Sequence, residues 1–157
     1  DQVAKNISQE DLFDGTLLEN ITLGRINTTV HDAIYALEQV GLSDTINAMP
    51  KGLETPILSG GKGLSKTVIH KIILARCLAK RPKLLVLNDF FITLAKPDKL
   101  ELLSCIINSK NPCTMILVSK DPIIMSACDR VIILGEGTIR TEGTMEELAS
   151  KEFLKDI

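Results

Sequence analysis

The chain of 157 residues has no tryptophan, and aromatic residues of every kind make up only 3% of it. Its core must therefore be built mainly from Leu, Ile and Val. No apolar run approaches the roughly 18 residues of a membrane-spanning helix, and no signal peptide opens the sequence. We therefore expect this chain by itself to be soluble. At 45% hydrophobic and 24% charged residues, the composition is that of one globular domain.

An excess of positive charge is also missing. The net charge of −2 and a pI near 5.7 argue against a nucleic-acid-binding protein. The four cysteines show no C-x-x-C spacing, and the two histidines lie far apart with no acidic cluster beside them. We expect free, buried thiols in a reducing compartment and no Cys/His metal site. Because the chain starts at Asp1 without Met, we also expect it to be a piece of a longer protein.

Periodicity and capping signals predict an alternation of helices and strands. One helix places Val30, Ala33, Ile34, Leu37 and Val40 on a single apolar face. In chain order the patterns predict a strand at 1–7, a helix opened by a Thr16–Glu19 capping box, helices at 28–41 and 43–49, a loop at 50–63, a helix at 64–80, buried strands at 83–89 and 113–121 separated by a helix at 97–110, a helix at 121–128, two strands joined at 135–137, and a last helix opened by Thr144 and Glu147.

This order predicts an α/β fold with a mostly parallel sheet. Ligands of such sheets usually bind beyond the carboxyl ends of the strands. Two predicted strands end there in polar residues, Asn88-Asp89 and Ser119-Lys120. These are the places where we expect chemistry.

Four segments in order resemble parts of one known family. They are "LFDGTLLENITLG", "GLETPILSGGKGLS", "ILARCLAKRPKLLVLND" and "ACDRVIILGEGTIRTEGTMEEL". Together they resemble the nucleotide-binding domain of ABC transporters of the exporter type, from about Val3 to Leu148. The resemblance implies a P-loop NTPase-type ABC ATPase core with an inserted helical subdomain at about 14–80. Residues 1–13 and 81–157 would form the rest of a single partial α/β domain that is truncated at its N-terminus.

The family's signature motif, Leu-Ser-Gly-Gly-Gln, has two candidate positions in this chain. Leu58-Ser59-Gly60-Gly61 matches it by letter. Counting back from Asn88 with the family's spacing instead reaches Leu64-Ser65-Lys66-Thr67-Val68, six residues later. We favour the later position and interpret the earlier match as a glycine-rich turn. An insertion of six residues after a true signature remains the alternative. In the family this motif presents backbone N–H groups to the γ-phosphate of ATP bound by the partner subunit.

The other positions that the resemblance implies have also changed. Asn88 stands where the family's Walker B motif has the Asp that holds Mg²⁺, so it is a weak Mg²⁺ position. Asp89 stands at the catalytic Glu, and Lys120 at the H-loop His. The Q-loop Gln falls on Ser8, with Gln9 one residue away. The D-loop Asp falls on Ala95, and a Glu that meets the transmembrane domain falls on Ser59.

The Walker A sequence, G-x-x-x-x-G-K-[ST], does not occur in these residues. In the family it lies upstream of the position of Val3. The resemblance therefore implies a cytoplasmic domain at the membrane face that couples ATP and Mg²⁺ binding to transport, with weak or no hydrolysis. Its partners would be an exporter's transmembrane domain and a second nucleotide-binding domain, identical or different, and no nucleic acid. A hydrolysis-competent ATPase and a structural module that binds no nucleotide are the alternatives.

Overall fold

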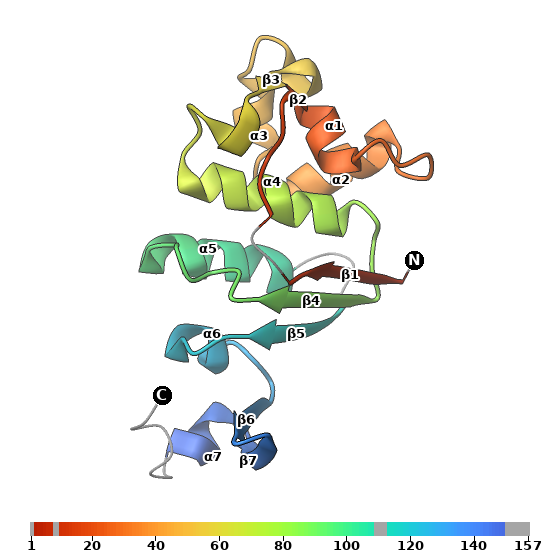
Figure 1. Ribbon diagram of the computed structural model, residues 1–157. Helices are drawn as coiled ribbons and strands as arrows, with labels where there is room; N and C mark the ends of the chain where they lie inside the picture. The colour runs from red at the N-terminus through yellow and green to blue at the C-terminus, as the bar shows by residue number, and fades with distance from the viewer. Residues whose placement is uncertain (1, 8–9, 109–112, 150–157) are drawn as a thin grey trace. The chain divides into compact units, whose positions relative to one another are not determined.

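The computed structural model describes residues 2–7, 10–108 and 113–149 (Figure 1). The chain divides into two compact units, Asp1–Leu117 and Val118–Ile157. The larger unit contains a group of helices and a parallel sheet. The smaller unit contains a two-stranded hairpin with a short helix on either side of it in the sequence. Each unit is described by itself.

Four helices form the helical part of the larger unit: α1 (Leu17–Thr22), α2 (Val30–Gln39), α3 (Ser43–Asn47) and α4 (Lys66–Leu78) (Figure 1). Helices α1 and α2 both begin with a capping box, in which a Thr side chain and the acidic side chain three residues later satisfy each other's backbone amides. Helix α4 is the longest of them and packs against both α1 and α2. It is buried continuously from Lys71 to Ala79, so it forms the centre of this part.

The sheet of the larger unit has the strand order β1-β4-β5, with β1 at Val3–Asn6, β4 at Leu84–Asn88 and β5 at Thr114–Val118. Strands β1 and β4 are parallel, and Val3 pairs with Leu84. Helix α5 (Lys96–Ile107) follows β4. Leu85 and Leu87 of β4 are buried, as are Leu102 and Leu103 of α5. Between α3 and α4 the chain forms two 3₁₀ turns, Gly52–Glu54 and Ser59–Gly61, and strand β3 (Pro56–Ile57), which pairs antiparallel with β2 (Gly15–Thr16).

Two cationic side chains of α4 are buried and paired. Lys71 contacts Glu101 of α5 at 2.5 Å between Nζ and Oε1. The Arg76 guanidinium donates to the carbonyl oxygen of Asn20 at 2.8 Å and to the Glu10 carboxylate at 3.2 Å. A buried charge is tolerated only when it is paired and hydrogen-bonded. Lys71 therefore attaches α4 to α5, and Arg76 attaches it to α1 and to the segment before α1.

The smaller unit consists of α6 (Pro122–Ser126), β6 (Val131–Gly135), β7 (Thr138–Gly143) and α7 (Met145–Ala149). Strands β6 and β7 are antiparallel, with an irregularity between Ile133 and Leu134. Met125, Val131 and Leu148 form its buried cluster.

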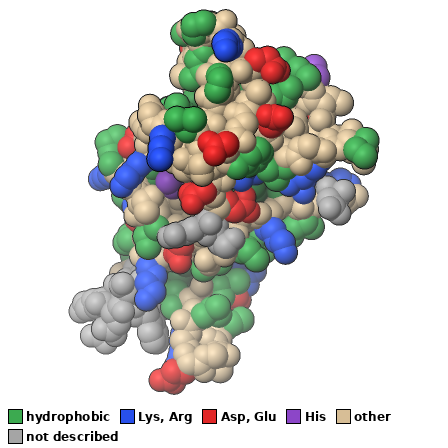
Figure 2. Space-filling model, turned by 45° about the horizontal axis from the view of Figure 1, so that its top comes forward, with side chains coloured by type: hydrophobic (Ala, Val, Ile, Leu, Met, Phe, Trp, Pro, Cys, Tyr) green, Lys and Arg blue, Asp and Glu red, His purple; other side chains and the backbone are tan. Residues whose placement is uncertain are grey.

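On the face of the molecule shown in Figure 2, acidic and basic side chains are interspersed with apolar ones, and no continuous basic surface forms there.

The α/β class with a parallel sheet is confirmed, and most predicted elements are present. Three details of the sequence analysis were wrong. Val30 and Ile34 are 50% and 45% exposed, because α2 packs on α4 through the narrower stripe of Ala33, Ala36 and Leu37. Strand β5 is only partly buried, and it is one of the two edge strands of the described sheet. The predicted loop at 50–63 contains the 3₁₀ turns and strand β3.

Candidate functional site

The carboxyl end of β4 carries the first group of predicted site residues. Asn88 is the last residue of the strand and is half-buried, whereas Asp89 is exposed. Asp89 has a φ of +49°, in the left-handed region. Asp and Asn adopt this conformation more readily than other non-glycine residues, because their short polar side chains bond locally. The left-handed residue turns the chain out of the strand and exposes the carboxylate at the end of the sheet.

A compact turn, Asp89–Ala95, joins β4 to α5; we call it the β4–α5 turn. Its backbone is closed by a hydrogen bond from the Ile92 amide to the Asp89 carbonyl at 3.1 Å. Phe90 and Phe91 are buried beneath it, with their rings edge to face at 5.2 Å between centroids. Ala95 is the N-cap of α5 and offers no side-chain cap. An Asp at this position would accept a backbone hydrogen bond, so Ala95 leaves this helix start without one.

The N-terminus of α4 carries the second group. Ser65 is the N-cap, and its hydroxyl oxygen accepts a hydrogen bond from the Val68 amide at 3.2 Å. Lys66 and Thr67 form the first turn of the helix, where backbone amides have no intrahelical acceptor. Leu64 precedes the cap and donates its amide to the Gly61 carbonyl at 2.9 Å. The helix therefore begins at the registration that the sequence analysis favours.

The letter match at Leu58–Gly61 lies in a separate 3₁₀ turn and not at the start of α4. The amides of Ser59, Gly60 and Gly61 are already bonded within the chain. The Ser59 amide donates to the Asp14 carboxylate at 2.8 Å. The Gly60 amide donates to the Leu12 carbonyl at 2.8 Å, and the Gly61 amide to the Leu58 carbonyl at 2.8 Å. A phosphate cradle needs amides that are free to bind the anion. This turn is consequently poorly suited to be one.

The remaining predicted positions lie in the smaller unit or outside the described residues. Lys120 follows β5 in the smaller unit and is exposed. The neighbouring Ser119 hydroxyl accepts from the Asp121 amide at 3.1 Å, and Asp121 caps α6. Ser8 and Gln9 lie outside the described residues. The roles assigned to all of these positions stay predictions.

The surroundings of the four thiols disfavour their reactive, charged form. Burial is the largest cause that raises the pKa of Cys77, to about 11, and the nearby Glu10 charge adds to it. Burial also raises the pKa of Cys105, Cys113 and Cys128. Cys77 is buried as expected, whereas Cys105, Cys113 and Cys128 are only partly buried, and all four thiols are free. A raised pKa disfavours the thiolate, which is the form that acts as a nucleophile or metal ligand. Among the described residues, no group of three or more His, Cys, Asp or Glu is placed to hold a metal ion.

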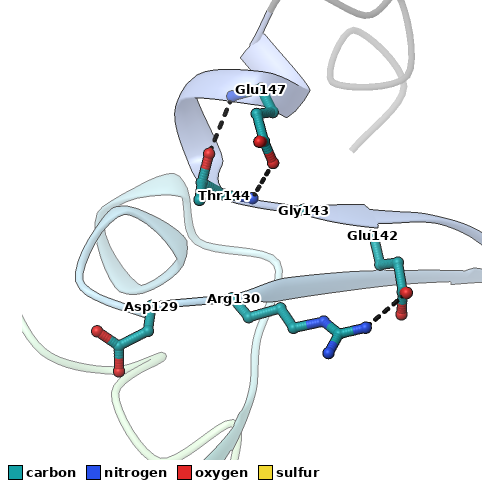
Figure 3. Close-up of a pocket in the computed structure, with 6 residues that line it drawn as sticks. All are labelled: Asp129, Arg130, Glu142, Gly143, Thr144 and Glu147. Atoms are coloured by element: carbon teal, nitrogen blue, oxygen red, sulfur yellow. Dashed lines mark hydrogen bonds and ion pairs between the residues drawn. The ribbon is translucent and has the colours of Figure 1, made fainter.

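A surface hollow of about 320 Å³ in the smaller unit is lined by polar side chains (Figure 3). Arg130 pairs with Glu142 across the hairpin at 2.5 Å. Glu147 accepts from the Thr144 amide at 2.8 Å and donates its own amide to the Thr144 hydroxyl oxygen at 3.2 Å. These contacts confirm the last capping box. The hollow is explained by groups that satisfy one another, and none of the predicted site residues lines it.

Sequence reasoning missed the neighbours of His70. This side chain lies on α4 and reaches the β4–α5 turn, where it meets the Thr93 hydroxyl at 3.2 Å and the Phe90 ring at 5.3 Å between centroids. The only signal in the sequence was a histidine in the second turn of a helix whose start was already of interest. Nothing in the sequence pairs it with a residue 23 positions later.

Within the part of the chain that the structure describes, no helix has both the length and the apolar character needed to cross a bilayer.

No profile of a known protein family matches the chain. Individual proteins do match it, and they agree with one another in kind.

Over 143 residues the chain is 29% identical to an uncharacterised ABC transporter ATP-binding protein, YfiB, of Bacillus subtilis. This match covers 91% of the chain and 25% of that protein. Over 139 residues it is 30% identical to the mitochondrial iron-sulfur clusters transporter ATM1 of Kluyveromyces lactis. This match covers 87% of the chain and 19% of that protein. The chain spans between 8% and 26% of the length of such curated relatives.

The fold is also that of a solved structure. A bacterial Atm1-family ABC exporter with ATP bound superposes with a TM-score of 0.81 at 20% identity, over 99% of this chain and 27% of that one. At this level of identity, the superposition establishes the fold, and the sequence matches add the relationship. Over about nine-tenths of its length, the chain is therefore homologous to the ATP-binding domains of ABC exporters.

Proposed function

We propose that this chain is part of the nucleotide-binding domain of an ABC exporter whose ATP hydrolysis is weak or absent. In the complete protein it would dock to the transmembrane domain at the cytoplasmic face of the membrane. It would also pair with a second nucleotide-binding domain, identical or different. Residues 14–80 would form the helical subdomain, and residues 1–13 and 81–157 the rest of the α/β core. The homology over most of the chain supports the domain assignment.

The observation that carries the loss of hydrolysis is the pair of side chains at the end of β4. Asn88, whose side chain is a neutral amide, is the last residue of the strand. The next residue, Asp89, carries an exposed carboxylate. Mg²⁺ prefers anionic oxygen ligands or the waters that they hold. The donor set therefore fits Mg²⁺ poorly. Asp89 is one methylene shorter than Glu, and a misplacement of about 1 Å can lower a rate on the order of 100-fold.

The start of α4 supports the same proposal. A nucleotide phosphate approaches a helix N-terminus closely only where no side chain stands in its way, which favours glycine. Here Lys66 and Thr67 occupy the first turn, after the Ser65 cap. The Ser65 hydroxyl oxygen already accepts a hydrogen bond from the Val68 amide of the helix. Lys66 adds a flexible positive charge beside it. A flexible ammonium attracts phosphate but does not shape a cradle for it.

Nucleotide binding and hydrolysis are tested separately in the complete protein. If ATP binds the native state, ATP at 100 times its Kd adds about 2.7 kcal/mol, which raises the Tm of a domain of about 150–250 residues by about 5–10 °C. Phosphate release in the presence of Mg²⁺ measures turnover, which we expect to be near background. The double variant Asn88→Asp with Asp89→Glu should raise turnover, because it restores the charge of the Mg²⁺ position and the reach of the carboxylate.

Matched variants decide between the alternatives. Asp44 of α3 is also an exposed carboxylate but lies in the helical part. Robust turnover that Asp89→Ala abolishes and Asp44→Ala preserves would contradict the proposal and establish a competent ATPase. The absence of any rise in Tm at millimolar ATP would instead favour a structural module that binds no nucleotide.

A further inference from the structure

His70 connects the start of α4 with the β4–α5 turn. The residue lies one helical turn after Lys66, and its Nδ1 is 2.8 Å from the Lys66 carbonyl oxygen. On the other side of the ring, Nε2 is 3.2 Å from the hydroxyl of Thr93, in the β4–α5 turn. The imidazole ring therefore bridges two segments that carry the two groups of predicted site residues.

The chemistry of these partners fixes the proton on Nδ1. A carbonyl oxygen can only accept a hydrogen bond, so Nδ1 must donate and carry a proton. In the neutral ring, Nε2 then has no proton and accepts from the Thr93 hydroxyl. One hydrogen bond thus holds the ring on α4, and the other holds the β4–α5 turn against the ring.

Aromatic packing adds to this contact. Phe90 meets the His70 ring edge to face, with 5.3 Å between centroids and an interplanar angle of 72°. Phe90 itself packs on Phe91, and both are almost completely buried. The two rings anchor the beginning of the β4–α5 turn in the core, while Thr93 attaches its exposed end. Asp89 lies directly before Phe90, so the position of its backbone depends on this anchor.

We propose that His70 is a positioning residue that fixes the β4–α5 turn to the start of α4, and thereby fixes Asp89 relative to Ser65 within one subunit. The consequence for nucleotide rests on the proposed function. The positioning role itself does not, because it is a property of the ring and its two hydrogen bonds.

The tautomer of His70 gives a spectroscopic test. Neutral imidazole in water favours the proton on Nε2, whereas this site requires it on Nδ1. Long-range ¹H–¹⁵N correlation spectra of the ¹⁵N-labelled chain, recorded where the rings are neutral, identify the protonated nitrogen. The chain has only two histidines, so His31→Gln leaves His70 as the single signal. A proton on Nε2 of His70 would overturn the proposal.

Hydrogen exchange measures the clamp itself. Thr93→Val keeps the shape of the side chain and removes the hydroxyl, so amides of residues 90–95 should exchange roughly two- to ten-fold faster, the effect of one lost hydrogen bond. Thr93→Ser should restore wild-type exchange. Thr138→Val is the matched control, because it removes a threonine hydroxyl that bonds the Gly135 carbonyl in the smaller unit. Equal exchange in Thr93→Val and wild type would overturn the proposal.

Nucleotide provides the last arm. If ATP raises the Tm of the complete wild-type protein, Thr93→Val should reduce that rise and Thr93→Ser should not. An equal rise in all three would overturn the positioning of the site. If ATP raises no Tm at all, the proposed function fails, and the tautomer and exchange results still decide the positioning role.

Discussion

The glycines at positions 60 and 61 offer a quantitative test of the 3₁₀ turn before α4. Both have a φ of +68°, so a Cβ at either position meets the left-handed penalty. They differ in the space around them. A Cβ on Gly61 would lie 2.7 Å from Cγ1 of Ile69 and 3.3 Å from Cδ1 of Leu12, whereas a Cβ on Gly60 would meet nothing within 4 Å.

This difference sets the expected magnitudes. The left-handed conformation costs a non-glycine residue about 1–2 kcal/mol, and this is the whole cost of Gly60→Ala. Gly61→Ala adds the cost of overpacking, about 1–3 kcal/mol. The free energy of unfolding should therefore fall by about 1–2 kcal/mol in Gly60→Ala and by about 2–5 kcal/mol in Gly61→Ala.

Urea denaturation measures both values. We expect the midpoints to shift in this order with little change in the m-value, because the same surface is exposed on unfolding. Each variant serves as the control for the other, since the backbone angle is the same and only the neighbours differ. Equal losses in the two variants would refute the packing around Gly61.

Gly60→Ala also tests the letter match to the signature. If Leu58–Gly61 contacted phosphate, a methyl group on Gly60 would block the approach and remove any rise in Tm caused by ATP. We expect that rise to remain, because the amides of Ser59 and Gly60 are bonded to Asp14 and Leu12. Loss of the response in a variant that is still folded would restore this turn as the signature.

Three further predictions concern buried and charged groups. Arg76→Ala should lower the free energy of unfolding by about 2–4 kcal/mol, because it leaves the Asn20 carbonyl without its buried donor; a loss below 1 kcal/mol in urea would contradict this. Cys77, with its pKa raised to about 11 by burial, should react with a disulfide reagent at pH 8 only at the rate of unfolding; rapid labelling of native protein would count against it. Hydrogen bonds from Thr29, first its amide and then its hydroxyl, lower the pKa of Asp32 from 3.8. The stability that this adds is present above pH 3.8 and is lost as pH falls through the lower native pKa. In Asp32→Asn the urea midpoint should therefore fall less steeply as the pH is lowered below 3.8. An unchanged pH dependence of the midpoint would argue against the cap.

Local chemistry made much of this fold predictable from the sequence. The capping boxes of Thr16 with Glu19 and of Thr144 with Glu147 involve residues three apart, and the structure confirms both. The helix at 64–80, the strand at 83–89 and the two strands joined at 135–137 follow from equally short patterns. Such features depend only on neighbours in the chain, so the sequence contains all the information that they need.

Long-range packing was not predictable in the same way. Whether Ile34 is covered depends on how α2 meets α4, and the helical period alone gives only the direction of the stripe. The bond from the Ser59 amide to Asp14 joins residues 45 apart, and it decides whether that turn can bind an anion. The pairing of Lys71 with Glu101 likewise joins two helices 30 residues apart. The candidate site could be located from strand and helix ends, but the contacts that qualify it could not.

Helix α4 shows why stability and chemistry can change separately in this chain. From Lys71 to Ala79 the helix is buried, so a substitution there alters packing or leaves a charge unpaired. At its first turn, Lys66 is exposed and contributes mainly its helix propensity. Glycine at such a position costs about 1 kcal/mol relative to a good helix former. Lys66 therefore favours the helix through its propensity while its positive charge opposes the helix dipole, and under the proposed function its side chain would obstruct a phosphate. A stable fold is then no measure of a working site.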